Sequence, residues 1–211
     1  CCGHDLYWSG DTDSFKRLAE LNLEAIARSG ARKVVFTCAE GYATFKMEYP
    51  RYFGPLSFEV RHLSELLAEE VSQGRLQLGG PERRITYQDP CRLGRAMGIY
   101  EAPRQVLGAI AGLELVEMER HGSEAVCCGS SQWLNCTSAT KQLQIQRLRE
   151  AHATGAQTLV TACPKCRIHL SCTLRDIEAV GAGLKPAFSL EIMDLTNLVA
   201  ESMIDEGPQT N

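Results

Sequence analysis

The alternation of apolar and polar positions predicts a chain in which helices alternate with short strands. Apolar residues recur at helical spacing over 15–28, and the β-branched, apolar run over 33–37 predicts a strand. We expect Asp13 to cap the helix and Gly30 to end it. Cys38 then stands at the carboxyl end of the strand, where open α/β sheets carry their functional residues.

The same order of elements recurs about 125 residues later. Cys127-Cys128-Gly129 repeats Cys1-Cys2-Gly3, and it is followed by an expected helix over 140–152, a strand over 158–161 and then Cys163. Two copies are too few for a solenoid. The pattern therefore predicts an α/β fold of two pseudo-symmetric repeats, each a small parallel sheet flanked by helices, with cysteines converging at the cleft between them.

A second alignment supports the duplication and helps to place the domain boundary. Residues 60–69 match 192–201 at a shift of 132 residues, and the glycine- and proline-containing stretch 74–82 separates the copies. The expected units are a truncated and degenerate first repeat over 1–78, a second repeat with a complete cysteine pattern over 79–204, and a disordered tail over 205–211.

Composition and charge restrict the class of function. With 211 residues and 44% hydrophobic content the chain is long enough to bury a core. A formal charge of -4 leaves no basic footprint, so nucleic acid is not expected as a partner. No apolar run approaches the roughly 18 residues that span a bilayer, so any membrane association would come through a partner subunit.

The cysteine content is high, at ten residues, and it favours metal binding over disulfides. Secreted disulfide scaffolds are short and rich in loops, whereas this sequence carries long helix patterns. The adjacent pairs Cys1-Cys2 and Cys127-Cys128 also disfavour disulfides, because neighbouring cysteines bridge each other only with strain. A reducing, cytoplasmic location follows, including one at the inner face of a membrane through a partner subunit.

Five cysteines of the second repeat form the main candidate site. Before the second Cys-Cys-Gly segment, the pattern predicts a strand over 84–88, a helix over 103–111 and a strand over 113–118. Cys91 therefore follows the end of a strand. The five are Cys91, Cys127, Cys128, Cys163 and Cys166. A single zinc takes four ligands, whereas a cluster of several irons offers more positions to thiolates, so the set favours an iron–sulfur cluster over a zinc-stabilised scaffold.

These residues resemble the cysteine-rich CCG-domain family. The matching segments are 89–95, Cys127-Cys128-Gly129 and Cys163-Pro164-Lys165-Cys166. The family includes the cysteine-rich subunit of heterodisulfide reductase, the iron–sulfur subunits of glycolate and lactate oxidation, and catalytic subunits of membrane complexes in sulfate reducers. The resemblance implies that the five cysteines hold a non-cubane [4Fe-4S] cluster whose iron engages a disulfide.

The first repeat departs from the family pattern. Gly41 stands where the second cysteine of the last pair is expected, and no initial cysteine precedes Cys1. A second, ordinary iron–sulfur cluster could be held by Cys1, Cys2 and Cys38 together with one cysteine upstream. The alternative, given equal weight, is that the first repeat has lost its cluster site.

Two functions remain open at this point. The first is an oxidoreductase subunit that reduces or forms a disulfide or related sulfur–sulfur bond, taking electrons from other iron–sulfur or flavin subunits and acting on a thiol, a disulfide or a small sulfur-carrier protein. The alternative is an electron relay for a flavin-dependent oxidoreductase of glycolate or lactate. Lys165, for charge, and His121, for protons, are the candidate catalytic residues beside the cysteines.

Overall fold

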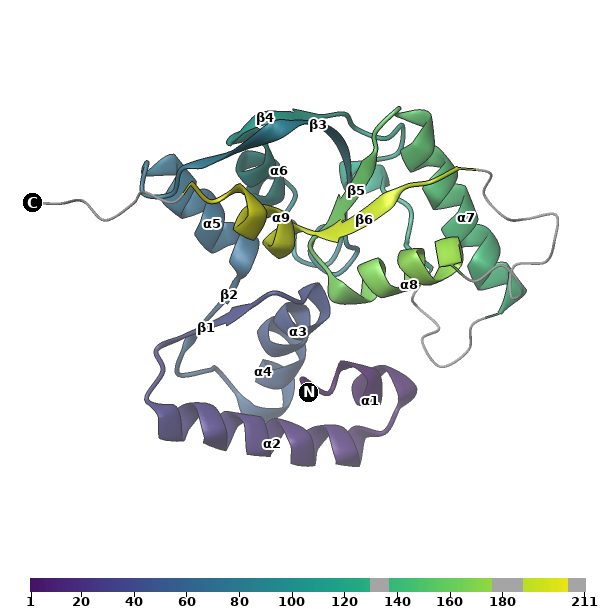
Figure 1. The fold of residues 1–211 in the computed structure, drawn as a ribbon. Helices are drawn as coiled ribbons and strands as arrows, with labels where there is room; N and C mark the ends of the chain where they lie inside the picture. Colours follow the sequence, from purple (N-terminus) through teal and green to yellow (C-terminus); the bar gives the residue numbers. More distant parts are fainter. Residues whose placement is uncertain (130–136, 176–187, 205–211) are drawn as a thin grey trace, which may run out of the picture.

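In the computed structural model, residues 1–129, 137–175 and 188–204 are described, and they form two parallel sheets flanked by helices (Figure 1). The elements, in chain order, are α1 (His4–Ser9), α2 (Thr12–Ser29), β1 (Lys33–Phe36), α3 (Ala39–Ala43), the π-helix η1 (Thr44–Glu48), α4 (Tyr49–Phe53), β2 (Glu59–His62), α5 (Leu63–Ser72), β3 (Leu78–Gln88), α6 (Glu101–Gly108), β4 (Ile110–Leu115), the 3-10 helix η2 (Gly122–Glu124), α7 (Ser138–Ala153), β5 (Thr158–Thr161), α8 (Pro164–Arg175), β6 (Glu191–Asp194) and α9 (Leu195–Ser202).

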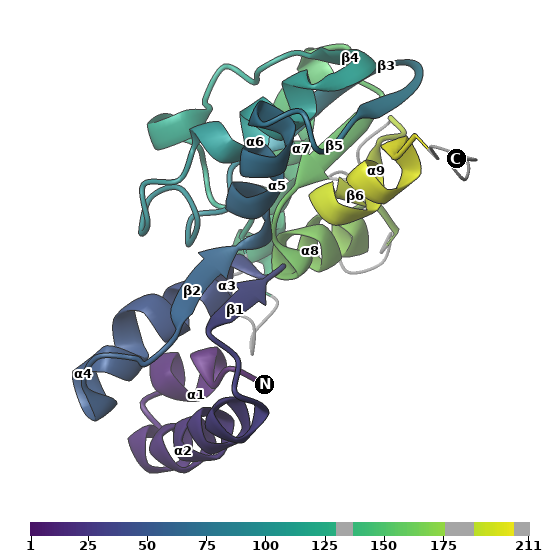
Figure 2. The ribbon, with the colours of Figure 1, turned by 90° about the vertical axis from the view of Figure 1, so that its left-hand side faces the viewer.

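The first half is built on the parallel pair β1–β2, with α1 to α4 packed beside it (Figure 2). An aromatic cluster holds these helices together, because Phe15 of α2 lies edge-on to Tyr49 and Phe45 stacks on Tyr49 with ring centroids 4.0 Å apart. Phe15 and Tyr49 are fully buried. Burial of such large apolar rings stabilises this small layer, whose two strands alone would be marginal.

The second half contains a four-stranded parallel sheet in the order β4-β3-β5-β6. Two helix pairs that contact each other, α5 with α6 and α7 with α8, flank this sheet (Figure 1). From β3 the chain moves outward to β4 and then returns across β3 to β5, so the strand order reverses between β3 and β5. Crevices beyond the carboxyl ends of strands at such a reversal are the usual binding sites of open α/β sheets.

The expected duplication is visible in the pairing of the strands. Phe36 of β1 pairs with His62 of β2, as Thr161 of β5 pairs with Asp194 of β6. His62 and Asp194 then cap the helices that follow, each accepting a hydrogen bond from a backbone N–H of the next turn. The two repeat-like α/β halves expected from the sequence are therefore confirmed.

Several element boundaries differ from the sequence expectation. Asp11, and not Asp13, caps α2, because its carboxylate accepts the N–H of Ser14 at 3.1 Å. Helix α6 and strand β4 begin and end earlier than expected. Strand β3 starts at Leu78, and Gly79 still pairs with Ala111 of β4. The register then shifts, and the pairing resumes at Arg83, so Gly80 and Pro81 lie in the irregular stretch between.

The boundary between residues 78 and 79 remains a prediction. Helix α5, within the expected first unit, packs against α6 of the second. The expected tail over 205–211 lies outside the described residues.

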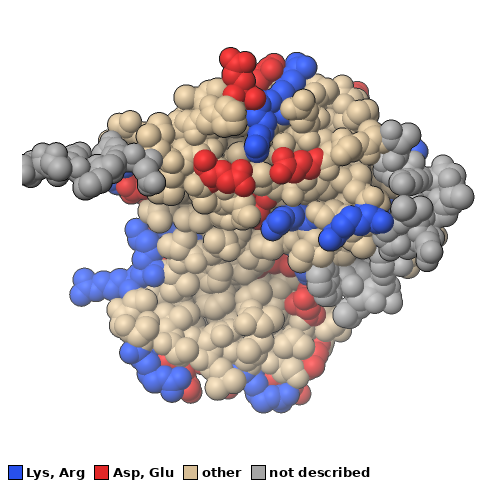
Figure 3. Space-filling model, viewed as in Figure 1, with Lys and Arg blue, Asp and Glu red and all other residues tan. Residues whose placement is uncertain are grey.

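Charged side chains of both signs lie on the described surface. Acidic and basic side chains are interspersed on the face shown in Figure 3, with no continuous basic field over its elements. None of the helices in the described ranges is both long and apolar enough to span a bilayer.

Candidate metal centre

The reversal of strand order brings cysteines from separate strand ends together. Cys91 follows the end of β3 at Gln88, and Cys163 follows the end of β5 at Thr161. These are the two strands between which the order reverses. The cysteines therefore occupy the crevice position that the topology provides.

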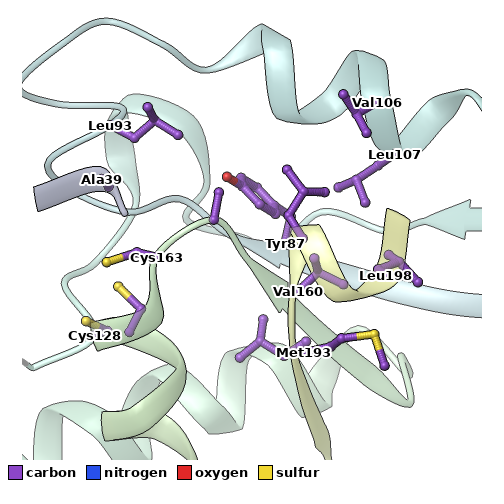
Figure 4. Packing of buried hydrophobic residues seen from close by; sticks show 14 of the residues in the cluster. Ala39, Tyr87, Leu93, Val106, Leu107, Cys128, Val160, Cys163, Met193 and Leu198 are labelled. Atoms are coloured by element: carbon purple, nitrogen blue, oxygen red, sulfur yellow. The ribbon is translucent and has the colours of Figure 1, made fainter. Parts of the chain in front are cut away.

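Thiol–thiol hydrogen bonds connect the cysteines of the second repeat. Cys163 and Cys166 are hydrogen-bonded to each other, Cys166 to Cys128, and Cys91 to Cys127. Figure 4 shows Cys128 and Cys163 at the same edge of the buried core. Because Cys127 and Cys128 are adjacent in the chain, these contacts join all five predicted cysteines into one constellation.

The segment that carries Cys127 and Cys128 is held from the end of β3. Asp89 accepts the backbone N–H of Gly122 at 2.8 Å and binds the guanidinium of Arg104 through both oxygens, at 2.8 and 2.9 Å. Asp89 is 4% exposed, so this carboxylate is compensated almost entirely by protein donors. Its contacts fix the loop that leads to the cysteine pair.

Two further side chains fix the residues directly before the pair. Gln88 donates to the carbonyl of Val126 at 3.1 Å, and Arg95 donates to the carbonyl of Ala125 at 2.8 Å. Sequence reasoning missed the positioning roles of Gln88, Asp89 and Arg104. The partners described above lie 15 to 38 residues away in the chain, and no local pattern marks such pairs.

Gly129 allows the chain to turn after the cysteine pair. Its φ is +76°, in the left-handed region that favours glycine, and a Cβ there would lie 2.8 Å from Cγ of Gln144 and 3.1 Å from the carbonyl oxygen of Thr140. Gly3 has the same role in the first repeat, with a φ of +82° and a Cβ position 2.9 Å from Phe15. The glycine of each Cys-Cys-Gly segment is therefore required by backbone conformation and by close packing.

Helix α8 begins directly after Cys163, and this placement affects the thiol. Hydrogen bonds from the thiols of Cys166 and Cys38, together with the backbone N–H groups of Cys166 and Lys165, hold the pKa of Cys163 well below its usual range. The hydrogen bond to Cys128 is the largest of the causes that raise the pKa of Cys166. A thiolate at Cys163 is the state that binds a soft metal.

The donor set fits an iron–sulfur cluster better than a single zinc. Four sulfurs around one zinc lie about 3.8 Å apart, as bond lengths of about 2.3 Å in a tetrahedron require. Within the described ranges, no three cysteine sulfurs lie mutually within 4.8 Å. A cluster separates its thiolates by several irons and accepts the wider spacing, so the five cysteines are suited to hold one.

Lys165, expected as a source of positive charge beside the cysteines, lies between the two halves. Its ammonium is 2.7 Å from Asp5 of α1 and 2.9 Å from Glu40 of α3. Burial opposes the charged form, but the hydrogen bonds to the two carboxylates raise the pKa of Lys165. His4, Asp5 and Glu40 lie close enough together to share a cation, and the lysine ammonium contacts two of the three.

His121, expected as a proton donor, lies at the surface before η2. It is 3.8 Å from Glu117, and its side chain is 48% exposed. Among the described residues, the carboxylate of Glu117 is the one charged group paired with His121. The histidine is therefore paired with a carboxylate and not with a cysteine of the candidate site. Its catalytic role remains a prediction, as does that of Lys165.

The three cysteines of the first repeat are not gathered in the same way. Cys1 is exposed, and the thiol of Cys2 is hydrogen-bonded to Thr44. The thiol of Cys38 is instead hydrogen-bonded to Cys163 of the second repeat. The structure thus adds Cys38 to the surroundings of the five predicted cysteines, whereas sequence reasoning had assigned it to a different site.

A comparison with family models identifies the family of this chain. The model described as a cysteine-rich domain matches residues 1–46 and 85–171, which is more than half of the chain and includes both Cys-Cys-Gly segments. The chain belongs to the cysteine-rich CCG-domain family.

Two curated relatives of this CCG-domain chain are named as oxidoreductase subunits, and a third as an iron–sulfur protein. A subunit of the dihydromethanophenazine:CoB–CoM heterodisulfide reductase from Methanosarcina barkeri is 36% identical over 96% of the chain and 49% of its own length. A subunit of the CoM/CoB fumarate reductase from Methanothermobacter marburgensis is 32% identical over 92% of the chain and 38% of its length. A protein of Methanocaldococcus jannaschii named as an iron–sulfur protein is 29% identical over 95% and 38%.

The chain spans about half of the length of these relatives or less. Among solved structures, an aspartate racemase homologue from Pyrococcus horikoshii aligns with 90% of the chain at 16% identity and a TM-score of 0.34, a likeness too weak to bear on fold or function.

Proposed function

We propose that this chain is the cluster-binding part of an oxidoreductase subunit that reduces or forms a disulfide, or a related sulfur–sulfur bond, at a non-cubane [4Fe-4S] cluster. The observation that carries the proposal is the constellation of Cys91, Cys127, Cys128, Cys163 and Cys166, which converge from separate strand ends and are linked by thiol contacts. When bound, such a cluster would supply electrons one at a time and an iron that engages sulfur.

The protein's own residues prepare this site for thiol chemistry. Hydrogen bonds from Cys166 and Cys38 lower the pKa of Cys163, and Lys165 brings a positive charge two residues away from it. In the proposal, Lys165 offsets the negative charge of several thiolates, and its two carboxylate partners keep it in place. His121, at the surface, is proposed to exchange protons with solvent when thiols are formed.

The proposed partners follow from the relatives. The names of two of them identify subunits of larger oxidoreductases, one a heterodisulfide reductase. We therefore propose that other iron–sulfur or flavin subunits deliver the electrons, and that a small thiol, a disulfide or a sulfur-carrier protein is the substrate. The alternative function is an electron relay in a flavin-dependent hydroxy-acid oxidoreductase, and the test below distinguishes the two.

The test is a pair of measurements on the anaerobically purified protein. Iron analysis should give about four irons per five-cysteine site, with visible charge-transfer absorption. Electron paramagnetic resonance of the oxidised protein should then change when 2-mercaptoethanol is added, because a substrate-like sulfur reaches the cluster. A cluster whose signal is identical with and without the thiol would support the relay. Zinc in place of iron would contradict both.

A further inference from the structure

We propose that Cys38, a residue of the first repeat, is a sixth thiol of the metal centre in the second repeat and gives way there to an incoming substrate thiol. The inference rests on the proposed function, because it assumes a cluster on the five cysteines of the second repeat. It goes beyond that function by assigning a residue to the position at which the substrate sulfur enters.

The geometry of the two strand ends supports this assignment. Cys38 follows β1 and directly precedes α3, and Cys163 follows β5 and directly precedes α8. The two thiols are hydrogen-bonded to each other. Two residues further along each helix, the carboxylate of Glu40 binds the ammonium of Lys165 at 2.9 Å. Two contacts of different kinds therefore hold the end of β1 against the end of β5.

The packing behind Cys38 strengthens this arrangement. Ala39 is fully buried in the same apolar core as Cys163, and Figure 4 shows the start of α3 beside that cysteine. Arg92, which follows Cys91, lies over the ring of Trp8 in α1 at 4.1 Å and provides another contact between the halves. Cys38 is thus fixed beside the five cysteines by contacts on more than one side.

The first repeat offers Cys38 little support for a cluster of its own. Gly41 stands where the family pattern has a cysteine, and a Cβ at this position would lie 3.0 Å from the ring of Phe36. A cysteine side chain there would press against this ring, so the space for a ligand is filled by aromatic packing. Cys1 is exposed, and Cys2 is directed to Thr44.

The chemistry of a sixth thiol follows from the number of ligands. Five cysteines already match the family pattern, so a sixth thiolate can occupy the iron position that a substrate sulfur would take. With a cluster bound by the five cysteines, Cys38 would be the sulfur ligand that leaves when the sulfur of an incoming thiol takes its place. The proton of the incoming thiol moves to Cys38. No electrons are transferred, and the net charge of the site is unchanged.

The decisive variant is Cys38→Ala, with Cys172→Ala as the matched control. Cys172 is a partly exposed thiol on α8 that contacts Lys141 at 3.3 Å and lies outside the constellation. Cys38→Ala should keep the iron content of the parent protein but change its visible absorption, because one sulfur ligand is lost. The concentration of 2-mercaptoethanol that half-saturates the spectral change should fall by about tenfold, since no internal thiol competes. Cys172→Ala should match the parent in both measurements.

Three results would overturn parts of this picture in distinguishable ways. Identical spectra and identical thiol titrations of Cys38→Ala and the parent would remove Cys38 from the site. Loss of about half of the iron from Cys1→Ala, Cys2→Ala and Cys38→Ala alike would show a second cluster in the first repeat. Different spectra without a thiol response in either protein would keep Cys38 at the site, but would contradict both the exchange and the proposed disulfide chemistry.

Discussion

The ammonium of Lys165 lies 2.9 Å from the carboxylate of Glu40, and this ion pair joins two helices that begin at separate sheets. Both side chains are mostly buried, at 10% and 13% exposure. Because Cys163 and Cys38 stand two residues before the two partners, the pair also determines how closely these cysteines approach each other.

Lys165→Met should destabilise the protein by about 3 kcal/mol, because it leaves the buried carboxylate of Glu40 without its cation. Denaturant unfolding under anaerobic conditions measures the change. The control is Lys33→Met, whose partner Glu59 is 3.5 Å away in an exposed pair and whose loss should cost less than about 1 kcal/mol. Equal effects of the two substitutions would show that the contact between the halves does not depend on Lys165.

Cys128→Ser and Cys163→Ser should each lose the visible absorption and most of the iron. Both thiols are buried and hydrogen-bonded within the constellation, and a hydroxyl is a poor ligand for iron in place of a thiolate. Cys172→Ser should retain both properties. An iron content in Cys128→Ser equal to that of the parent would remove this residue from the ligand set.

Gly129→Ala should cost about 3 kcal/mol and reduce iron incorporation. The substitution combines a left-handed backbone with a Cβ position 2.8 Å from Gln144, directly after the cysteine pair. Gly98→Ala is the matched control, since Gly98 has a φ of +72° but no atom within 4 Å of the added Cβ. It should cost about 1 kcal/mol for the backbone alone. The difference between the two free energies of unfolding isolates the steric contact.

Asp89→Asn should destabilise the protein by about 3 kcal/mol and slow the loading of iron. The carboxylate binds Arg104 through two oxygens and also accepts the N–H of Gly122, so its neutralisation weakens the support of the segment before Cys127. Glu114→Gln breaks only an exposed pair with Arg84 and should change stability by less than about 0.5 kcal/mol. A normal rate of iron loading in Asp89→Asn would contradict the positioning role.

The stability of the parent protein relative to the variant His4→Gln should fall in acid. Burial, followed by the positive charges of Arg92 and Lys165, lowers the pKa of His4 to about 4. Between pH 6.5 and about 4 the unfolded chain binds a proton at this residue that the folded chain does not. The stabilising contribution is present above pH 6.5 and is lost as the pH falls. Unfolding free energies of the two proteins measured across this range check the loss, and a difference that stays constant would contradict it.

The sequence by itself determined the order of the local elements and marked the five cysteines as the candidate site. Strand β5 has the bounds that its apolar, β-branched run predicts, and the aligned segments 60–69 and 192–201 both form the end of a strand followed by a helix. Periodicity and capping depend on residues within a few positions of one another, so a sequence displays them directly. The spacing of the five cysteines is likewise a property of the chain.

Only the tertiary structure decided which distant groups meet. The thiol of Cys38 faces Cys163, 125 residues further along, and not the cysteines of its own repeat. Lys165 is bound by Asp5, 160 residues away, and Asp89 supports a loop that begins 33 residues later. Such contacts arise from the packing of one half on the other, which depends on the shape of both surfaces and leaves no periodic signal in the sequence.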